Sequence, residues 1–341
     1  MFPLQPTKQN FGRLAFALIG FSAFILYGLI STDSLSPSSE PLAAADEYPR
    51  NINTGVSGSR FGGRIAIALN KPLAVQYVTP PFKIQAMFEK IGYRLENVRQ
   101  DGEVPRFFIA ELPTNYRDIT QPKTRKAVFI KLVLPLILNA NEDILQERAK
   151  LLALRDKIKS DINLTTDEAN WLRKISKDYN LDRLDFSELV RRIDTIPPSL
   201  ALAQAAEESG WGTSRFAREG NAIFGQRIWH GDDGIEPERR EDGARFRVRS
   251  FARLIDGVKS YTRNLNSHFA YNEFRRLRFR QRVKNNKING YELAATLLQY
   301  SQRGQAYTET IRMLMRVNNL QIFDKARLQD PPMVDNYRPD A

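Results

Sequence analysis

The chain has 341 residues, 42% of them hydrophobic, and its 51 Lys and Arg against 39 Asp and Glu leave a net charge of +12. This length is enough for one large or two modest domains, and the charge favours an anionic polymer or an anionic membrane surface as partner. No cysteine is present, which excludes disulfides, thiol nucleophiles and cysteine metal sites.

The two histidines, His230 and His268, lack the His-Glu-x-x-His spacing of a zinc hydrolase. We therefore expect no metal and no cofactor. The sequence also has no zinc-finger spacing, no RNA-recognition signature and no basic helix of the usual kind. Nucleic acid is accordingly not an expected partner, in spite of the positive charge.

Residues 14–30 are almost wholly apolar and follow Lys8 and Arg13. Such a stretch is typical of a signal peptide or of a short signal anchor. Three alanines at 43–45 resemble a cleavage site, but they lie far past the apolar run. The sequence therefore favours an uncleaved transmembrane helix over residues 1–31, positive end inside. It would anchor the protein in the inner membrane, facing the periplasm.

Residues 32–62 are rich in Ser, Pro, Gly, Ala and Asn and are predicted to form a flexible linker, and residues 329–341 a disordered tail. Residues 63–195 are predicted to form a helical subdomain that packs against the rest and holds no catalytic group. Its helices are expected at 82–95, 124–138, 141–159 and 186–193, with an extended stretch at 105–112. Pro135 should kink or split the second of these helices, and Thr165 with Glu168 has the spacing of a capping box.

One short helix with both ends marked is predicted between the prolines at 197–198 and Gly210, where a left-handed cap would close it. Its residues are small and mostly apolar, so other segments can pack close to it. At 100° per residue Glu207 points away from the apolar face and is interpreted as a solvated carboxylate. Glu208 lies at the border of that face, where partial desolvation would raise its pKa. A carboxylic acid still protonated near neutral pH is the proton donor that glycosidic cleavage requires.

The remainder of the chain alternates a small β element with helices. Ser214 is predicted to cap a short helical turn, and residues 229–248 to form a β-hairpin whose returning strand is 244–248. Ser250 should cap a helix whose buried stripe runs from Phe251 to Leu265. Further helices are expected at 291–300 and 307–319.

The run Ala-Gln-Ala-Ala-Glu-Glu-Ser-Gly-Trp-Gly-Thr-Ser at 203–214, followed by Asn-Ala-Ile-Phe-Gly at 221–225, resembles the signature of the glucosaminidases of glycoside hydrolase family 73. Those enzymes cut the glycan strands of peptidoglycan. Pro-Arg-Phe-Phe at 105–108, the run 126–148 and Tyr-Ser-Gln-Arg-Gly at 300–304 make the chain similar to the Bax-type proteins of bacteria. The resemblance covers roughly residues 80–328. It implies that Glu208 is the catalytic acid and that peptidoglycan is the substrate.

The same resemblance implies a mainly α fold with a small β-hairpin lobe, that is, a lysozyme-like catalytic domain over residues 196–328. Related enzymes carry a second carboxylate on the outgoing strand of the hairpin, where Glu236 is the first choice ahead of Glu238. Assistance by the acetamido group of the substrate is the alternative to that second carboxylate.

Five further residues are predicted at the site. Tyr300 resembles the cleft tyrosine of the family, or is a packed tyrosine. Trp211 and Phe224 are expected to stack on sugar rings, although Trp211 fits a core position equally well. Asn221 is expected to hydrogen-bond a sugar or to hold its turn, and Gln204 to contact substrate.

Three functions follow from these residues. The first is an endo-β-N-acetylglucosaminidase that cleaves β-1,4 bonds. A lytic transglycosylase also needs only one acid, but the Gly-Leu-Met-Gln run usual in that class is missing. The third is a wall-binding scaffold that keeps the fold without catalysis.

Overall fold

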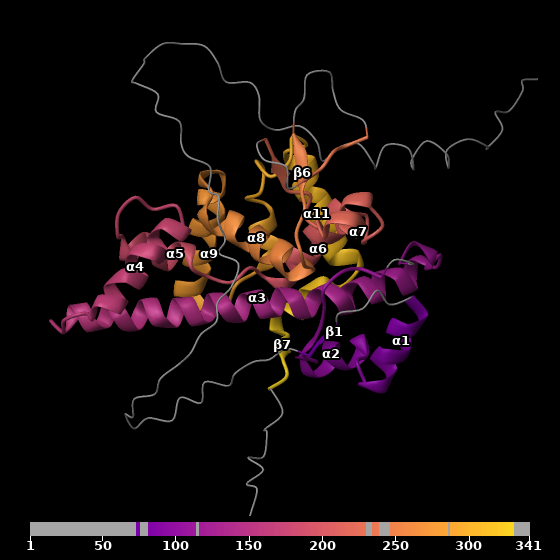
Figure 1. The fold of residues 1–341 in the computed structure, drawn as a ribbon, viewed down its shortest axis with the longest axis horizontal. Coiled ribbons are helices and arrows are strands. Elements are labelled where there is room, and N and C mark those ends of the chain that lie inside the picture. Colours follow the sequence, from indigo (N-terminus) through magenta and orange to yellow (C-terminus); the bar gives the residue numbers. More distant parts are fainter. Residues whose placement is uncertain are drawn as a thin grey trace, which may run out of the picture. The chain divides into compact units, whose positions relative to one another are not determined.

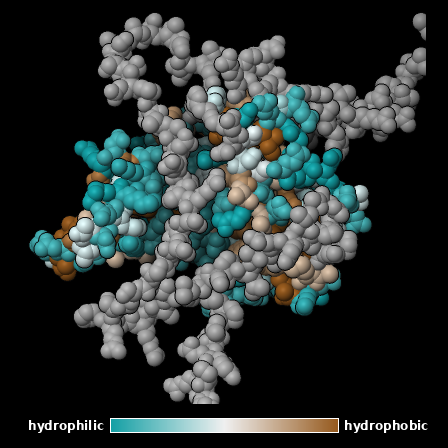
Figure 2. Space-filling view, in the orientation of Figure 1, coloured by the Kyte–Doolittle hydropathy of each residue, from teal (hydrophilic) through white to brown (hydrophobic). Residues whose placement is uncertain are grey.

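A long central helix organises the part of the chain that the computed structural model describes, which is residues 73–75, 81–113, 116–229, 234–238, 246–285 and 287–330 (Figure 1). The expected membrane segment, the linker and the tail beyond residue 330 lie outside these ranges. Within them, no helix combines the length and the apolar character needed to cross a bilayer. The described residues belong to one compact unit, and the view in Figure 2 shows a surface with many hydrophilic side chains.

The central helix α3 runs unbroken from Pro122 to Lys159 over 38 residues and contains Pro135. The predicted split into two helices at Pro135 is therefore wrong. A proline removes one bond of the helical ladder, but Pro135 is buried within an apolar run from Val128 to Leu138 that packs on other elements. We infer that this packing offsets the local cost.

The N-terminal part of the described chain packs against this helix. Helix α1 (Pro81–Lys90) confirms the helix predicted at 82–95 but ends before Gly92, which adopts a positive φ, and α2 (Leu95–Asp101), which was not predicted, follows. Strand β3 (Phe107–Ile109) confirms the extended stretch and pairs in parallel with β1 (Leu73–Val75). Strand β2 (Glu103–Val104) pairs in parallel with the last strand, β7 (Arg327–Leu328).

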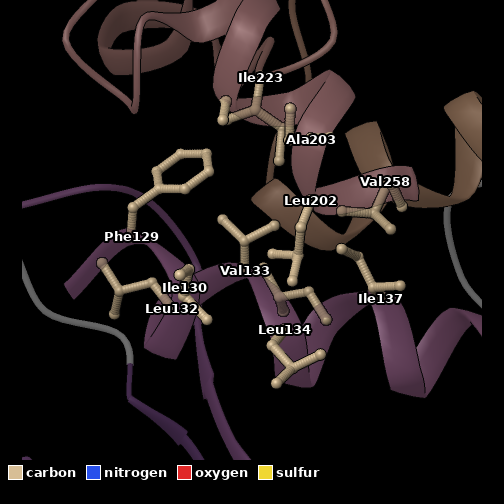
Figure 3. Packing of buried hydrophobic residues seen from close by; sticks show 14 of the residues in the cluster. Phe129, Ile130, Leu132, Val133, Leu134, Ile137, Leu202, Ala203, Ile223 and Val258 are labelled. Atoms are coloured by element: carbon tan, nitrogen blue, oxygen red, sulfur yellow. The ribbon is translucent and has the colours of Figure 1, made fainter. Parts of the chain in front are cut away.

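Two hydrophobic cores lie along α3. The first half of α3 contributes Phe129, Val133 and Ile137 to a core that also holds Leu202 and Val258 (Figure 3). The second half packs with α4 (Thr166–Asp178) and α5 (Phe186–Arg192) in a separate cluster. The boundary predicted at 195/196 therefore does not divide two cores, because residues 84–140 share the core of the C-terminal part. The capping box of Thr165 and Glu168 is formed as predicted.

Helix α6 (Pro198–Ser209) is the predicted helix with both ends marked, and Gly210 closes it in the left-handed conformation. It lies against α3, α10 (Gly290–Ala294), α11 (Gln305–Val317) and the 3-10 helix η3 (Leu320–Lys325). Ten of its residues are buried, including the polar Gln204. The sequence predicted one apolar face, whereas α6 is enclosed on nearly all sides.

A small antiparallel sheet has the strand order β4-β6-β5, and its strand β5 contacts α7 (Arg215–Gly220) (Figure 1). Strand β4 spans Arg227–Ile228, β5 spans Gly234–Ile235, and β6 spans Arg247–Arg249. The predicted β element is thus confirmed, with its returning strand shifted to 247–249. Ser214 caps α7 (Arg215–Gly220) as predicted.

The remaining helices differ from expectation at their ends. Helix α8 (Leu254–Ser267) begins after Arg253 and not at the predicted Ser250 cap. A further helix, α9 (Asn272–Asn285), follows a 3-10 turn at Phe269–Tyr271 and was not predicted. A second 3-10 turn at Tyr116–Asp118 precedes α3. The predicted fold class, mainly helical with a small β element, is confirmed.

Candidate active site

Glu208 lies in the last turn of α6, one helical turn after Gln204. Residues four apart share one face of a helix, so both side chains reach toward α11. Gly210 then ends the helix, and its N–H donates to the carbonyl of Ala206. The rigid, closely packed helix therefore fixes the backbone that carries the predicted acid.

Three other buried side chains connect to Glu208 through hydrogen bonds. The hydroxyl of Tyr307 donates to Oε1 of Glu208 over 3.0 Å. Nε2 of Gln204 donates to the same hydroxyl over 3.0 Å, and the hydroxyl of Tyr261 donates to Oε1 of Gln204 over 2.7 Å. Tyr307 lies in the first turn of α11 and Tyr261 lies on α8, so three helices meet at this carboxyl group.

Burial raises the pKa of Glu208 to about 7, and the nearby charge of Glu207 adds to that effect. The hydrogen bond from Tyr307 and the charges of Arg303 and Arg227 act in the opposite direction. A carboxyl with this pKa is protonated in a large fraction of molecules at neutral pH, which suits a general acid. Its second oxygen, Oε2, faces Gly225, where a Cβ would stand 3.7 Å from it, and the side chain stays partly exposed.

Glu207 is not the solvated carboxylate that the helical projection predicted. It forms an ion pair with Arg303, Oε1 to Nη2, over 2.9 Å, and its side chain is only 19% exposed. The guanidinium of Arg303 also lies over the ring of Tyr307, 5.5 Å from its centroid. The prediction failed because the loop before α11 covers a face of α6 that its own sequence marks as polar.

Tyr300 lies at the site as predicted, and its ring stacks on that of Tyr307 with centroids 5.3 Å apart. Burial raises its pKa well above the usual value, and the charge of Glu208 adds to the shift. The side chain keeps partial exposure. Tyr300 therefore packs on Tyr307, the residue that donates to Glu208, and also remains partly accessible.

The structure assigns other tasks to Gln204 and Phe224. Gln204 is fully buried, and both atoms of its amide contact tyrosines, so the predicted contact with substrate is wrong. Phe224 is buried and stacks on Tyr261 with centroids 3.7 Å apart, which leaves no face for a sugar. Both residues support the hydrogen-bonded chain.

The structure supports the core position for Trp211 and the role of holding a turn for Asn221. Trp211 packs edge-on against Phe129, and Nζ of Lys126 lies 5.0 Å from the centre of its ring. Asn221 closes α7 in the left-handed conformation and donates from its amide nitrogen to the carbonyl of Phe251 over 3.0 Å. One packs on the core and the other holds a turn.

Glu236, the predicted second carboxylate, follows β5, which β6 separates from β4. Its carboxylate accepts from Nη2 of Arg247 over 3.0 Å and is 59% exposed. Glu238 is more exposed still and pairs with Arg215. The charges that shift the pKa of Glu208 come instead from Glu207, Arg303 and Arg227. The structure thus assigns Glu236 to an exposed ion pair on the lobe.

Four residues that act on Glu208 were not predicted there: Tyr261, Tyr307, Arg303 and Arg227. Tyr261 belongs to the buried stripe predicted for its helix, and Arg303 belongs to the motif at 300–304. Their partnership with Glu208 joins positions up to 99 residues apart, which no local pattern indicates. Among the residues described, no cluster of three metal-ligand side chains occurs.

A half-buried carboxylic acid of near-neutral pKa is the group that glycoside hydrolases use as proton donor. Residues 185–320 match the model of the Glucosaminidase family, described as mannosyl-glycoprotein endo-beta-N-acetylglucosaminidase. The chain is therefore a glycoside hydrolase with a domain of that family, and this domain contains Glu208, Tyr300 and Tyr307. The matched stretch contains the motif at 203–225, so the match agrees with the resemblance that this motif indicates.

Two further proteins are similar to this chain. Protein bax of Escherichia coli (strain K12) is 29% identical over 200 residues, which are 57% of this chain and 70% of that protein. The crystal structure of the catalytic domain of the autolysin Auto from Listeria monocytogenes aligns with 50% of this chain and 96% of its own. Its TM-score is 0.30 and its sequence identity 16%.

Proposed function

We propose that the protein hydrolyses β-1,4 glycosidic bonds in the glycan strands of peptidoglycan, as an endo-β-N-acetylglucosaminidase. The observation that carries the proposal is Glu208, a half-buried carboxylic acid whose pKa is raised by desolvation to about 7 within the glucosaminidase domain. The net charge of +12 suits a polymer whose peptide stems carry carboxylates. A lysozyme-like arrangement, with substrate between the β lobe and the helices, accounts for the exposed side of the acid.

In this mechanism protonated Glu208 gives its proton to the glycosidic oxygen while the bond to the sugar breaks. The resulting carboxylate is stabilised by the hydroxyl of Tyr307 and by the positive charges of Arg303 and Arg227. The exposed, ion-paired position of Glu236 favours attack by the acetamido group of the substrate over activation of water by a second carboxylate.

The decisive experiment is digestion of purified peptidoglycan by the full chain and by Glu208→Gln, followed by mass spectrometry of the products. We expect reducing N-acetylglucosamine ends from the parent, and a rate about 100-fold to 10,000-fold lower from the variant, as for loss of a general acid. Anhydro ends would identify a lytic transglycosylase. Intact glycan with the parent would identify a non-catalytic scaffold.

The role of Glu236 is tested separately. If the acetamido group is the nucleophile, Glu236→Ala and Glu238→Ala, singly and together, retain activity within a few-fold of the parent. A loss as deep as that of Glu208→Gln, with partial rescue by azide, would instead establish Glu236 as the general base.

We propose further that the apolar segment at 14–30 anchors the protein in the inner membrane, with the enzyme facing the periplasm. The support is the sequence alone, which places Lys8 and Arg13 before the segment. The full chain should sediment with membranes, and a chain without residues 1–31 should not. A mature form that starts near Asp46 would show cleavage and refute the anchor.

A further inference from the structure

The hydrogen bonds behind Glu208 form a chain of four side chains in the order Tyr261, Gln204, Tyr307, Glu208. The first three lie at or near zero exposure, and each tyrosine ring is held by a stacked neighbour, Phe224 or Tyr300. The amide of Gln204 does not ionise, and burial raises the pKa of Tyr261 and of Tyr307 well above the usual value, so all three groups are neutral at neutral pH. The chain is therefore a neutral, rigid support that contacts one oxygen of the acid.

The amide of Gln204 sets the direction of donation along this series of hydrogen bonds, which we call the relay. An amide nitrogen can only donate and an amide oxygen can only accept. Nε2 of Gln204 donates to the hydroxyl oxygen of Tyr307, so the single proton of that hydroxyl is free to point to Oε1 of Glu208. At the other end, Oε1 of Gln204 accepts the proton of Tyr261, which fixes the orientation of the amide.

A carboxyl oxygen that already accepts a hydrogen bond from Tyr307 is a poor place for the proton of the acid form. That proton is left to Oε2, the oxygen that faces Gly225. We propose that Tyr261, Gln204 and Tyr307 are positioning residues that hold the transferable proton of Glu208 on Oε2 and so set the side from which the acid donates. This inference rests on the proposed function of Glu208 as the acid.

The charged groups near Glu208 also shift its pKa, and they are separate from the hydrogen bonds of Tyr261, Gln204 and Tyr307. Glu207 on α6 disfavours the carboxylate, whereas Arg303 before α11 and Arg227 on β4 favour it. The tyrosines from α8 and α11 and Tyr300 contact or approach the same carboxyl as neutral groups. Removing one hydroxyl at a time therefore changes the relay and leaves all of these charges in place.

The direction of the relay predicts the sign of a pKa change in Tyr307→Phe. A hydroxyl that donates to Glu208 stabilises the carboxylate, so its loss should raise the pKa of Glu208. Were the amide of Gln204 turned over, Tyr307 would donate to Gln204 and accept the proton of Glu208. The same substitution would then destabilise the acid form and lower the pKa.

The experiment is a titration of the full chain, labelled with ¹³C at the glutamate side-chain carboxyls, with Glu208 assigned as the signal lost in Glu208→Gln. We expect Tyr307→Phe to move the midpoint of Glu208 upward by about one pH unit, the size of one hydrogen bond to a charged group. Tyr261→Phe, at the far end of the relay, should move it in the same direction by less. A downward shift, or no shift in either variant, overturns the proposal.

The matched control is Tyr179→Phe, because the hydroxyl of Tyr179 also donates to a carboxylate, Oε2 of Glu147, but in the other hydrophobic cluster. It should leave the midpoint of Glu208 unchanged. The alkaline limb of the cleavage rate should follow the same order among the variants, since the acid must be protonated. The titration does not depend on cleavage, so failure of the proposed function leaves the relay testable by itself.

Discussion

At the scale of single residues, the acid depends on neighbours that its own sequence does not reveal. The run around Glu208 identified the acid, and its partial desolvation could be expected from its place at the edge of an apolar face. Its partners could not, because Tyr307, Arg303 and Arg227 reach it from other elements. The sequence likewise misassigned Gln204 and Phe224, which are conspicuous in the motif but buried behind the acid.

Glu207 tests how far a neighbouring charge tunes the acid. The Glu207 carboxylate raises the pKa of Glu208 and pairs with Arg303. In Glu207→Gln that repulsion is lost and Arg303 is left without its counter-ion. Both changes favour the carboxylate of Glu208, so the alkaline limb of the rate should move to lower pH. We expect roughly two- to fivefold lower cleavage at neutral pH.

The comparison for this variant is Glu142→Gln, which breaks another Glu–Arg pair, with Arg106, away from the site. Its pH profile should match that of the parent. An unchanged limb in Glu207→Gln would show that the charge of Glu207 does not act on the acid.

At the scale of elements, the sequence predicts the ends of a helix where the helix carries its own capping residues. It does not predict them where tertiary packing determines whether the helix continues. Helix α6, the capping box of α4 and the Ser214 N-cap of α7 follow from residues next to them in the chain. Helix α3 continues through Pro135 because distant segments pack on it, although an interior proline costs about 3 kcal/mol. Helix α9 was missed because it buries Arg275 and Arg278, which a hydropathy pattern assigns to the surface.

The turn after α6 shows how closely α6 is held to α3. Gly212 has φ +81, and a Cβ there would stand 3.0 Å from the ring of Tyr116 and 3.2 Å from that of Phe129. Gly212→Ala should therefore combine backbone strain with overpacking and lower the free energy of unfolding by about 2–5 kcal/mol. Urea denaturation measures this loss.

Gly92→Ala is the matched control, since Gly92 has φ +67 with no atom within 4 Å of a Cβ. It should cost only the backbone term, about 1–2 kcal/mol. Equal losses in the two variants would show that the turn can move away from α3.

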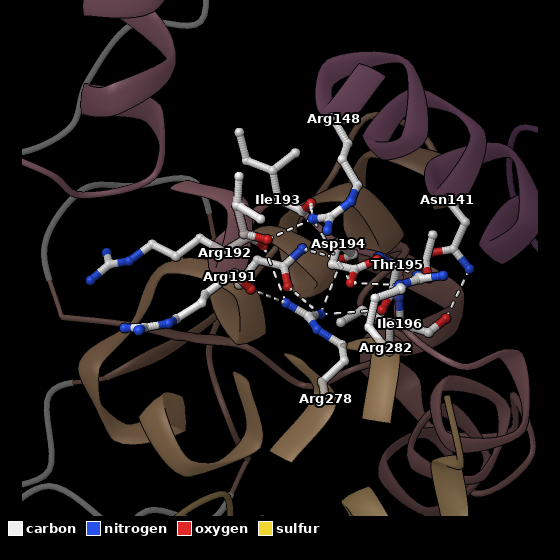
Figure 4. Close-up of polar contacts among 12 residues, drawn as sticks. Asn141, Arg148, Arg191, Arg192, Ile193, Asp194, Thr195, Ile196, Arg278 and Arg282 are labelled. Carbon is white, nitrogen blue, oxygen red and sulfur yellow. Dashed lines mark hydrogen bonds and ion pairs between the residues drawn. The ribbon is translucent and has the colours of Figure 1, made fainter. Parts of the chain in front are cut away.

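At the scale of the whole molecule, a buried network of arginines joins the two hydrophobic cores. Asp194 lies between α5 and α6 and is 2% exposed. It accepts from Nε of Arg282 over 3.1 Å, and Nη1 of Arg148 approaches it at 3.9 Å (Figure 4). Arg278, wholly buried, donates to the carbonyls of Asp194 and Arg191. The carboxylate of Asp194 is thus the counter-ion of arginines from both α3 and α9, at the junction of the two cores.

This network makes Asp194 the position where the two cores should come apart. Burial would raise its pKa, but Arg278, Arg282 and Arg148 outweigh burial and hold it below the ordinary value. Its contribution to stability is therefore present above the unfolded pKa of about 3.9 and is lost as the pH falls through the lower folded pKa. Asp194→Asn should remove that contribution at neutral pH.

We expect Asp194→Asn to lower the free energy of unfolding by about 3–5 kcal/mol, because it leaves buried arginines without their counter-ion. The exposed ion pair of Arg155 with Asp156 gives the control, since Asp156→Asn should cost under about 1 kcal/mol. Hydrogen exchange then locates the loss. If Asp194 couples the cores, amides of α4 and α5 should exchange faster in Asp194→Asn while those of α6 stay protected. A uniform loss of protection in both cores would show that they unfold as one unit even without this carboxylate.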